Sequence, residues 1–139
     1  RVALGRSGVG KTTLANLAKT KSGKIIQDDR LFLRKRGHRW WLFPVPLNGS
    51  DYHKGCQLHQ MYSLTQSKQV LSIPILDQLR YSYFLPHMVH FPKWKNSYTH
   101  QLQLVNELLD AIRLSLFYFP KHPKSIDYLT HGPTPNKYT

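Results

Sequence analysis

The sequence contains few acidic residues and almost no cysteine. Seven of its 139 residues are Asp or Glu and 20 are Lys or Arg, which gives a formal net charge of +13 at pH 7. This excess of positive charge favours a polyanionic partner, and we expect a nucleotide. Nucleic acid is an alternative, but charge alone is not enough to favour it. Cys56 is the single cysteine, so an internal disulfide and a cysteine-based zinc site are both excluded.

Long apolar runs are also missing. None approaches the roughly 20 residues of a membrane-spanning helix, so we expect no membrane span. The eight histidines include no H-x-x-x-H pair, and we assign no metal ligand among them. An apolar content of 40% with 19% charged residues is typical of a globular chain. We expect one domain over residues 1–131, followed by a flexible tail over 132–139 that contains Gly132, Pro133 and Pro135.

One stretch near the start of the sequence predicts a definite chemistry. Residues 5–12 read G-R-S-G-V-G-K-T and fit the phosphate-loop (Walker A) pattern G-x-x-x-x-G-K-[ST]. Glycines allow a tight turn whose backbone N–H groups point into one concavity and bind phosphate oxygens. The side chain of Lys11 would reach the β- and γ-phosphates, and the Thr12 hydroxyl would bind the magnesium ion between them. The predicted nucleotide-binding residues are Gly5, Arg6, Ser7, Gly8, Val9, Gly10, Lys11, Thr12 and Thr13.

The flanking residues have the pattern that this motif requires. Residues 2–4 (V-A-L) are typical of the end of a buried strand, and residues 12–19 predict a helix with Leu14, Leu17 and Ala18 on one face. The alternative is a glycine-rich turn with a chance lysine. Because the strand is short and no initiating Met precedes it, we expect a fragment whose upstream part is missing. The triphosphate site and the single cysteine together suggest the cytoplasm.

The rest of the chain predicts alternating strands and helices. Residues 31–43 predict a β-hairpin with its turn at Gly37-His38. Trp40, Trp41 and Phe43 could stack on bases, but alternation in a hairpin favours core packing, with one aromatic buried and its neighbour half-exposed. A helix is expected from Ile75, with Ile75, Leu76, Leu79 and Phe84 on one face. The remaining predicted elements are strands at 24–27, 58–64, 70–73 and 114–119, a helix over the apolar stripe 102–112, an irregular segment at 87–96 and a short helix at 125–129.

Two adjacent carboxylates form the second chemical feature. Asp28 and Asp29 follow the expected strand at 24–27, and the carboxyl ends of strands are where open α/β sheets place their ligand sites. Neighbouring carboxylates repel unless a cation neutralises them, and magnesium on a triphosphate is such a cation. One carboxylate would hold the metal, and the other would accept a proton from an attacking hydroxyl. The alternative is a solvated turn in which Arg30 is their partner.

These two motifs at this separation resemble the HPr kinase/phosphorylase family, and more closely its smaller serine-kinase-like members. The resemblance rests on G-R-S-G-V-G-K-T-T-L and, seventeen positions after the lysine, Asp28-Asp29-Arg30. It implies an α/β phosphate-loop domain of the phosphoenolpyruvate-carboxykinase-like type, with a mixed sheet and flanking helices. It also implies ATP and Mg²⁺ as cofactors and transfer of the γ-phosphoryl group to a serine hydroxyl. By position, Asp28 resembles the general base, Lys11 the phosphate-binding lysine, and Asp29 with Thr12 the metal ligands.

The chain departs from this family in places. The glycine-rich signature of the bifunctional enzymes is not found, which argues against HPr as the substrate and more strongly against phosphorylase activity. The acceptor and the oligomeric state are left open. No L-S-G-G-Q, N-K-x-D or D-x-x-G segment indicates a transporter ATPase or a GTPase. Residues 71–77 imitate a Walker B strand, but Pro74 would disrupt a central strand. Two further alternatives are a non-catalytic nucleotide-binding remnant and a basic, nucleic-acid-associated phosphate-loop NTPase.

Overall fold

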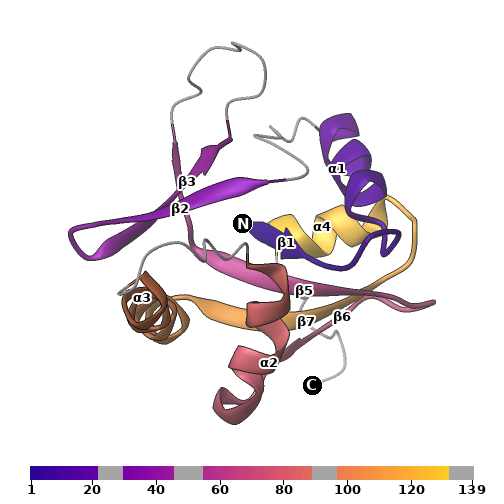
Figure 1. The fold of residues 1–139 in the computed structure, drawn as a ribbon. Helices are drawn as coiled ribbons and strands as arrows, with labels where there is room; N and C mark the ends of the chain where they lie inside the picture. Colours follow the sequence, from indigo (N-terminus) through magenta and orange to yellow (C-terminus); the bar gives the residue numbers. More distant parts are fainter. Residues whose placement is uncertain (22–29, 46–54, 89–96, 132–139) are drawn as a thin grey trace.

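The computed structural model describes residues 1–21, 30–45, 55–88 and 97–131. Within these ranges the chain forms a mixed α/β structure (Figure 1). The strands are β1 (Val2–Leu4), β2 (Leu31–Arg36), β3 (Arg39–Pro44), β4 (Cys56–Gln57), β5 (Gln60–Gln66), β6 (Leu71–Pro74) and β7 (Arg113–Phe119). The helices are α1 (Lys11–Thr20), α2 (Arg80–Phe84), α3 (Ser97–Ala111) and α4 (Lys124–His131), and short 3₁₀ turns at Asp77–Leu79 and Leu85–His87 flank α2.

The main sheet has four described strands in the order β1-β5-β7-β6. β1 pairs with β5 in parallel and β5 pairs with β7 in parallel, whereas β6 runs antiparallel to β7. The expected mixed sheet with flanking helices is therefore confirmed. Because β1, β5 and β7 are parallel, their carboxyl ends meet at one edge of the sheet, which is where ligands bind in such folds.

A second, antiparallel sheet has the order β2-β3-β4. Its first two strands form the expected hairpin, in which Leu31 pairs with Pro44 and Arg36 with Arg39. Gly37 occupies the turn with φ +58°, a left-handed conformation that glycine adopts without strain. Trp40 is buried and Trp41 is half-buried, so the expected alternation of a core aromatic and a partly exposed neighbour is confirmed.

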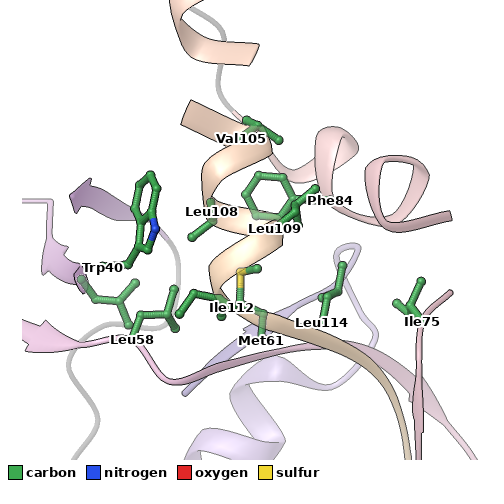
Figure 2. Close-up of a cluster of buried hydrophobic side chains, with 11 residues drawn as sticks. Trp40, Leu58, Met61, Ile75, Phe84, Val105, Leu108, Leu109, Ile112 and Leu114 are labelled. Carbon is green, nitrogen blue, oxygen red and sulfur yellow. The ribbon is translucent and has the colours of Figure 1, made fainter. Parts of the chain in front are cut away.

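Two hydrophobic clusters form the core. The larger one joins the second sheet to α2, α3 and strands of the main sheet, and Figure 2 shows Trp40 of β3 lying against Leu108 of α3. The smaller one packs α1 and α4 against β5 and β7, with Phe117 and Phe119 fully buried. Successive residues of β5, such as Met61 and Tyr62, belong to different clusters because side chains alternate across a strand.

The predicted strand at 58–64 is confirmed from Gln60 onward as β5 and is wrong for its first two residues. Its first part follows β4 in the antiparallel sheet, where the Leu58 N–H still donates to the Trp40 carbonyl at 2.8 Å. Its second part is β5 in the main sheet. The apolar character runs through both parts because Leu58 and Met61 are each buried in the larger cluster. The sequence pattern therefore does not mark where the chain passes from one sheet to the other.

The predicted helical face from Ile75 is also wrong. Ile75 extends the pairing of β6, since its N–H donates to the Leu114 carbonyl at 3.1 Å. The next turn is a 3₁₀ turn with three residues per turn, so residues spaced for an α-helix do not share a face. Leu76 and Leu79 are exposed, whereas Phe84 is buried as expected.

The other predicted elements match the structure, with small shifts at their ends. The stripe on α3 is confirmed, because Val105, Leu108 and Leu109 are buried in the larger cluster. The α1 face is confirmed too, with Leu14 buried in the smaller cluster. β1 is less buried than expected, since it is the outermost of the described strands of its sheet and Ala3 is exposed. The predicted strand at 24–27, the tail at 132–139 and most of the segment at 87–96 lie outside the described residues.

Two sequence alternatives concern features that the structure describes. The segment that imitates a Walker B strand is β6, an antiparallel strand at the end of the described sheet order, and Asp77 beyond it pairs with Arg80. Pro74 is tolerated there because an edge strand need not donate every N–H. None of the described helices combines the length and the apolar character that crossing a bilayer requires.

Candidate phosphate-binding site

The predicted phosphate loop lies between β1 and α1, so the strand, the loop and the helix follow one another as the motif requires. β1 runs in parallel beside β5, with Val2 opposite Met61 and Leu4 opposite Ser63. The loop therefore leaves the main sheet at the edge where the parallel strands end. The residues from Gly5 to Thr13 come together here as one continuous segment.

Glycine conformation shapes the second half of the loop. Gly8 has φ +81° and Gly10 has φ +106°, conformations that residues with a side chain rarely adopt. Gly10 is also confined, because a Cβ atom there would lie 3.1 Å from Cζ of the buried Phe119. Gly5 is confined as well, since a Cβ atom would lie 2.4 Å from Cγ1 of Val9. All three glycines of the loop thus have a physical reason to be glycine.

The N-terminus of α1 presents backbone donors to the loop. The Leu14 N–H donates to the Gly10 carbonyl at 2.9 Å and is the first helical bond. The N–H groups of Lys11, Thr12 and Thr13 precede it and have no intrahelical acceptor. No side chain caps this end of the helix, and its first turn contains no acidic residue. Free N–H groups and the helix dipole together favour an anion at this position.

The Lys11 ammonium binds the loop itself. Its Nζ donates to the Gly5 carbonyl at 2.8 Å and to the Arg6 carbonyl at 3.0 Å. The side chain is half-buried and ties the helix to the start of the loop. An ammonium group has three hydrogens, so one remains for a phosphate oxygen.

Gln66, the last residue of β5, supports the loop from the neighbouring strand. Its Nε2 donates to the Val9 carbonyl at 3.1 Å and to the Gly8 carbonyl at 3.3 Å. These two bonds tie the second half of the loop to the end of β5. The sequence does not reveal this role, because Gln66 lies just beyond the strand expected at 58–64. A polar residue at the end of the strand beside β1 can support the loop. The sequence indicates such a residue only if β5 is already known to pair with β1.

His87 is a second residue near the loop that the sequence analysis did not single out. Burial lowers its pKa below the ordinary value of 6.5, and the positive charges of Lys11 and Arg6 lower the pKa further. His87 ends the 3₁₀ turn after α2. The charges of the loop therefore lower the pKa of a residue that is distant from the loop in the sequence. Both effects favour the neutral imidazole over its charged form.

The donors available for a metal ion are limited in the described part of the chain. No group of three His, Cys, Asp or Glu residues suited to a metal is found among the described residues. Thr12, in the first turn of α1, is exposed and offers one hydroxyl oxygen. This fits magnesium bound to a triphosphate, because such an ion takes most of its ligands from phosphates and water. Asp28 and Asp29 lie outside the described residues, so their convergence on the loop remains a prediction.

Comparison with known proteins adds one structural likeness. No known family profile matches the chain, and no curated protein matches its sequence. Among solved structures, the Hpr(Ser) kinase/phosphatase from Coxiella burnetii is similar, with a TM-score of 0.49 and 15% sequence identity. The match covers 93% of this chain and 83% of that one.

Proposed function

We propose that this chain binds ATP at the loop of residues 5–13 and acts as a phosphotransferase resembling the HPr-kinase-like serine kinases. The observation that carries the proposal is the loop geometry at the carboxyl end of β1. Two glycines with positive φ, a helix that begins at Lys11 and a sheet edge made of parallel strands occur together there. The motif resemblance of residues 5–12 and 28–30 supports the choice of kinase among phosphate-loop proteins.

Each loop residue then has a defined task. The N–H groups at the start of α1 bind and orient phosphate oxygens, and the free Lys11 hydrogen adds a charged donor. The Thr12 hydroxyl would hold magnesium, which supplies neutralisation of phosphate charge when it is bound. Gln66 ties the second half of the loop to the end of β5. Phosphoryl transfer depends chiefly on such positioning and charge stabilisation.

The acceptor side of the reaction rests on the two neighbouring carboxylates. In our proposal Asp28 accepts the proton of the attacking hydroxyl, and Asp29 supports the metal. The phosphate acceptor is a hydroxyl group on a protein or a small molecule. We propose ATP rather than GTP because of the family resemblance and because the sequence has no guanine-binding N-K-x-D segment.

Nucleotide titration of Lys11→Ala tests the binding step. We expect loss of measurable binding of a fluorescent ATP analogue, because the substitution removes the charged donor. Lys19→Ala is the matched control: Lys19 is exposed on the same helix, so its loss removes equal charge away from the loop. Circular dichroism checks that both variants are folded, which matters because Lys11 also bonds to the loop carbonyls.

Two results would change the proposal. Unaltered affinity in a folded Lys11→Ala protein would contradict nucleotide binding at this loop. Tight ATP binding with no phosphate release or transfer would favour the non-catalytic nucleotide-binding protein instead. Competition between ATP and GTP in the same titration tests the base preference, and a clear preference for GTP would contradict the kinase assignment.

A further inference from the structure

The hairpin of β2 and β3 has an outer face with an unusual composition. Residues that are paired in an antiparallel ladder point to the same side of the sheet. The register pairs Phe32 with Phe43, Arg34 with Trp41, and Arg36 with Arg39. These six residues, three arginines and three aromatics, therefore share one face, which we call the Arg–aromatic face. The opposite face carries Trp40 and Leu42 into the core.

The Arg–aromatic face is open to solvent. All three of its arginines are exposed, and Phe32 is 51% exposed. Trp41 and Phe43 are half-buried. In Figure 1 the hairpin turn extends away from the four-stranded sheet, and Lys35 near the turn pairs with Glu107 of α3. Phe32 and the three arginines are thus accessible to a partner, whereas Gly55 lies against the Phe43 ring.

Its charge is unbalanced. The acidic residues in the described ranges are Asp77, Glu107, Asp110 and Asp127, and each pairs with a cation elsewhere. Glu107 binds Lys35 at 2.5 Å, and Lys35 lies on the other face of β2. Within the described part of the chain, no acidic group pairs with Arg34, Arg36 or Arg39. Three neighbouring guanidinium groups that none of the four described acids pairs with favour an anionic partner.

Aromatic planes are arranged along the same face. The guanidinium of Arg36 lies over two rings, with its Cζ 4.9 Å from the centroid of Phe43 and 5.9 Å from that of Trp41. A guanidinium stacked on a ring exposes its second planar surface and keeps its N–H groups at the rim. The face therefore combines flat surfaces with charged donors at close spacing.

We propose that the Arg–aromatic face binds a short stretch of single-stranded nucleic acid. Unpaired bases have the flat surfaces that stack on aromatic rings and guanidinium groups, and the phosphates between them pair with arginine. A duplex keeps its bases stacked inside and offers only its phosphates. An acidic peptide matches the charge but not the row of flat surfaces. This face belongs to a different sheet from the phosphate loop, so the proposal does not depend on the proposed kinase function.

Fluorescence anisotropy of a labelled oligothymidylate of about 12 nucleotides tests the proposal, with the complete chain and no added ATP. We expect binding that weakens as salt rises, with a weaker affinity for the duplex of the same length. Replacing Arg34, Arg36 and Arg39 together by glutamine should weaken binding at about 0.1 M salt by on the order of a hundredfold, about fivefold for each arginine–phosphate pair that is removed. Circular dichroism checks the fold of each variant.

Matched single variants separate the two faces of one strand. Arg34→Gln should weaken binding about fivefold, whereas Lys35→Gln removes the same charge from the opposite face and should change it less than about twofold. Phe32→Ser and Trp41→Leu should each weaken binding about five- to tenfold through the loss of stacking, without reducing the salt dependence. Lys11→Ala should leave oligonucleotide binding unchanged even where it abolishes ATP binding.

Several outcomes would overturn the proposal. One is equal affinity of the triple arginine variant and the unaltered protein. Another is equal binding of duplex, heparin and oligothymidylate, which would reduce the face to a general anion-binding surface. A third is stronger binding of a polyglutamate peptide than of the oligonucleotide, which would identify an acidic protein as the partner. Equal effects of Arg34→Gln and Lys35→Gln would show that net charge, and not this face, governs binding.

Discussion

Replacing Gly10 with alanine should destabilise the protein and its loop together. For a residue with a Cβ atom, a left-handed conformation costs about 1–2 kcal/mol, and Gly10 has φ +106°. The new methyl group would also lie 3.1 Å from Cζ of Phe119. That ring is fully buried and stacks on Phe117 at 5.8 Å, so it has little room to move. Overpacking of this kind costs about 1–3 kcal/mol, for a total of about 2–5 kcal/mol.

Two other glycines separate the conformational cost from the packing cost. Gly8 and Gly37 also have positive φ, but a Cβ atom at either would have no neighbour within 4 Å. Denaturant unfolding should therefore give losses of about 1–2 kcal/mol for Gly8→Ala and Gly37→Ala, and a clearly larger loss for Gly10→Ala. ATP affinity should fall for both loop variants and stay unchanged for Gly37→Ala. Equal losses of stability at Gly8 and Gly10 would refute the packing argument.

Three further predictions concern residues around the loop. Gln66→Ala should weaken ATP binding several-fold and lower the free energy of unfolding by about 1 kcal/mol, whereas the exposed Gln69→Ala should alter neither. The pKa of His87 is lowered in the folded protein, so the unfolded chain binds more protons below about pH 6.5 and stability should fall as the pH drops from 7 to 5. Urea unfolding at both values should show a smaller fall for His87→Gln, and an equal fall would contradict this interpretation. Asp28→Asn should keep ATP binding but slow transfer by on the order of a hundredfold or more, and transfer at the full rate would exclude Asp28 as the base.

The sequence predicted best those features that depend on neighbouring residues. The strand–loop–helix order around residues 5–12 and the hairpin turn at Gly37 are local, and both occur in the structure. The sequence-based prediction failed where residues distant in the sequence determine the local structure. Ile75 pairs with Leu114 instead of entering a helix, and Gln66 acts on the loop only because β5 lies beside β1. Periodicity contains no information about which strands become neighbours.

Even Lys11 illustrates this limit. Its place in the motif predicted its position at the start of α1, but not its bonds to the Gly5 and Arg6 carbonyls. Those bonds depend on how tightly the loop turns back toward the helix. The Arg–aromatic face needed the structure for a similar reason. Alternation predicted that one aromatic of the pair at 40–41 would be buried, whereas the cross-strand register brought three arginines and three rings together.

The pairing of β1 with β5 has a consequence for the order in which the site is assembled. The loop closes around supports that come much later in the chain, since Gln66 lies 58 residues beyond the Gly8 carbonyl that it holds. During synthesis the loop residues therefore emerge well before the strand that shapes them, and the concavity forms only once that long-range pairing is made. A ligand bound in the loop would stabilise the folded chain and not the nascent segment. Its contribution to the free energy of unfolding would grow with the ratio of ligand concentration to dissociation constant. A ligand bound at the loop would thus protect the fully folded protein, but not the nascent chain, from unfolding.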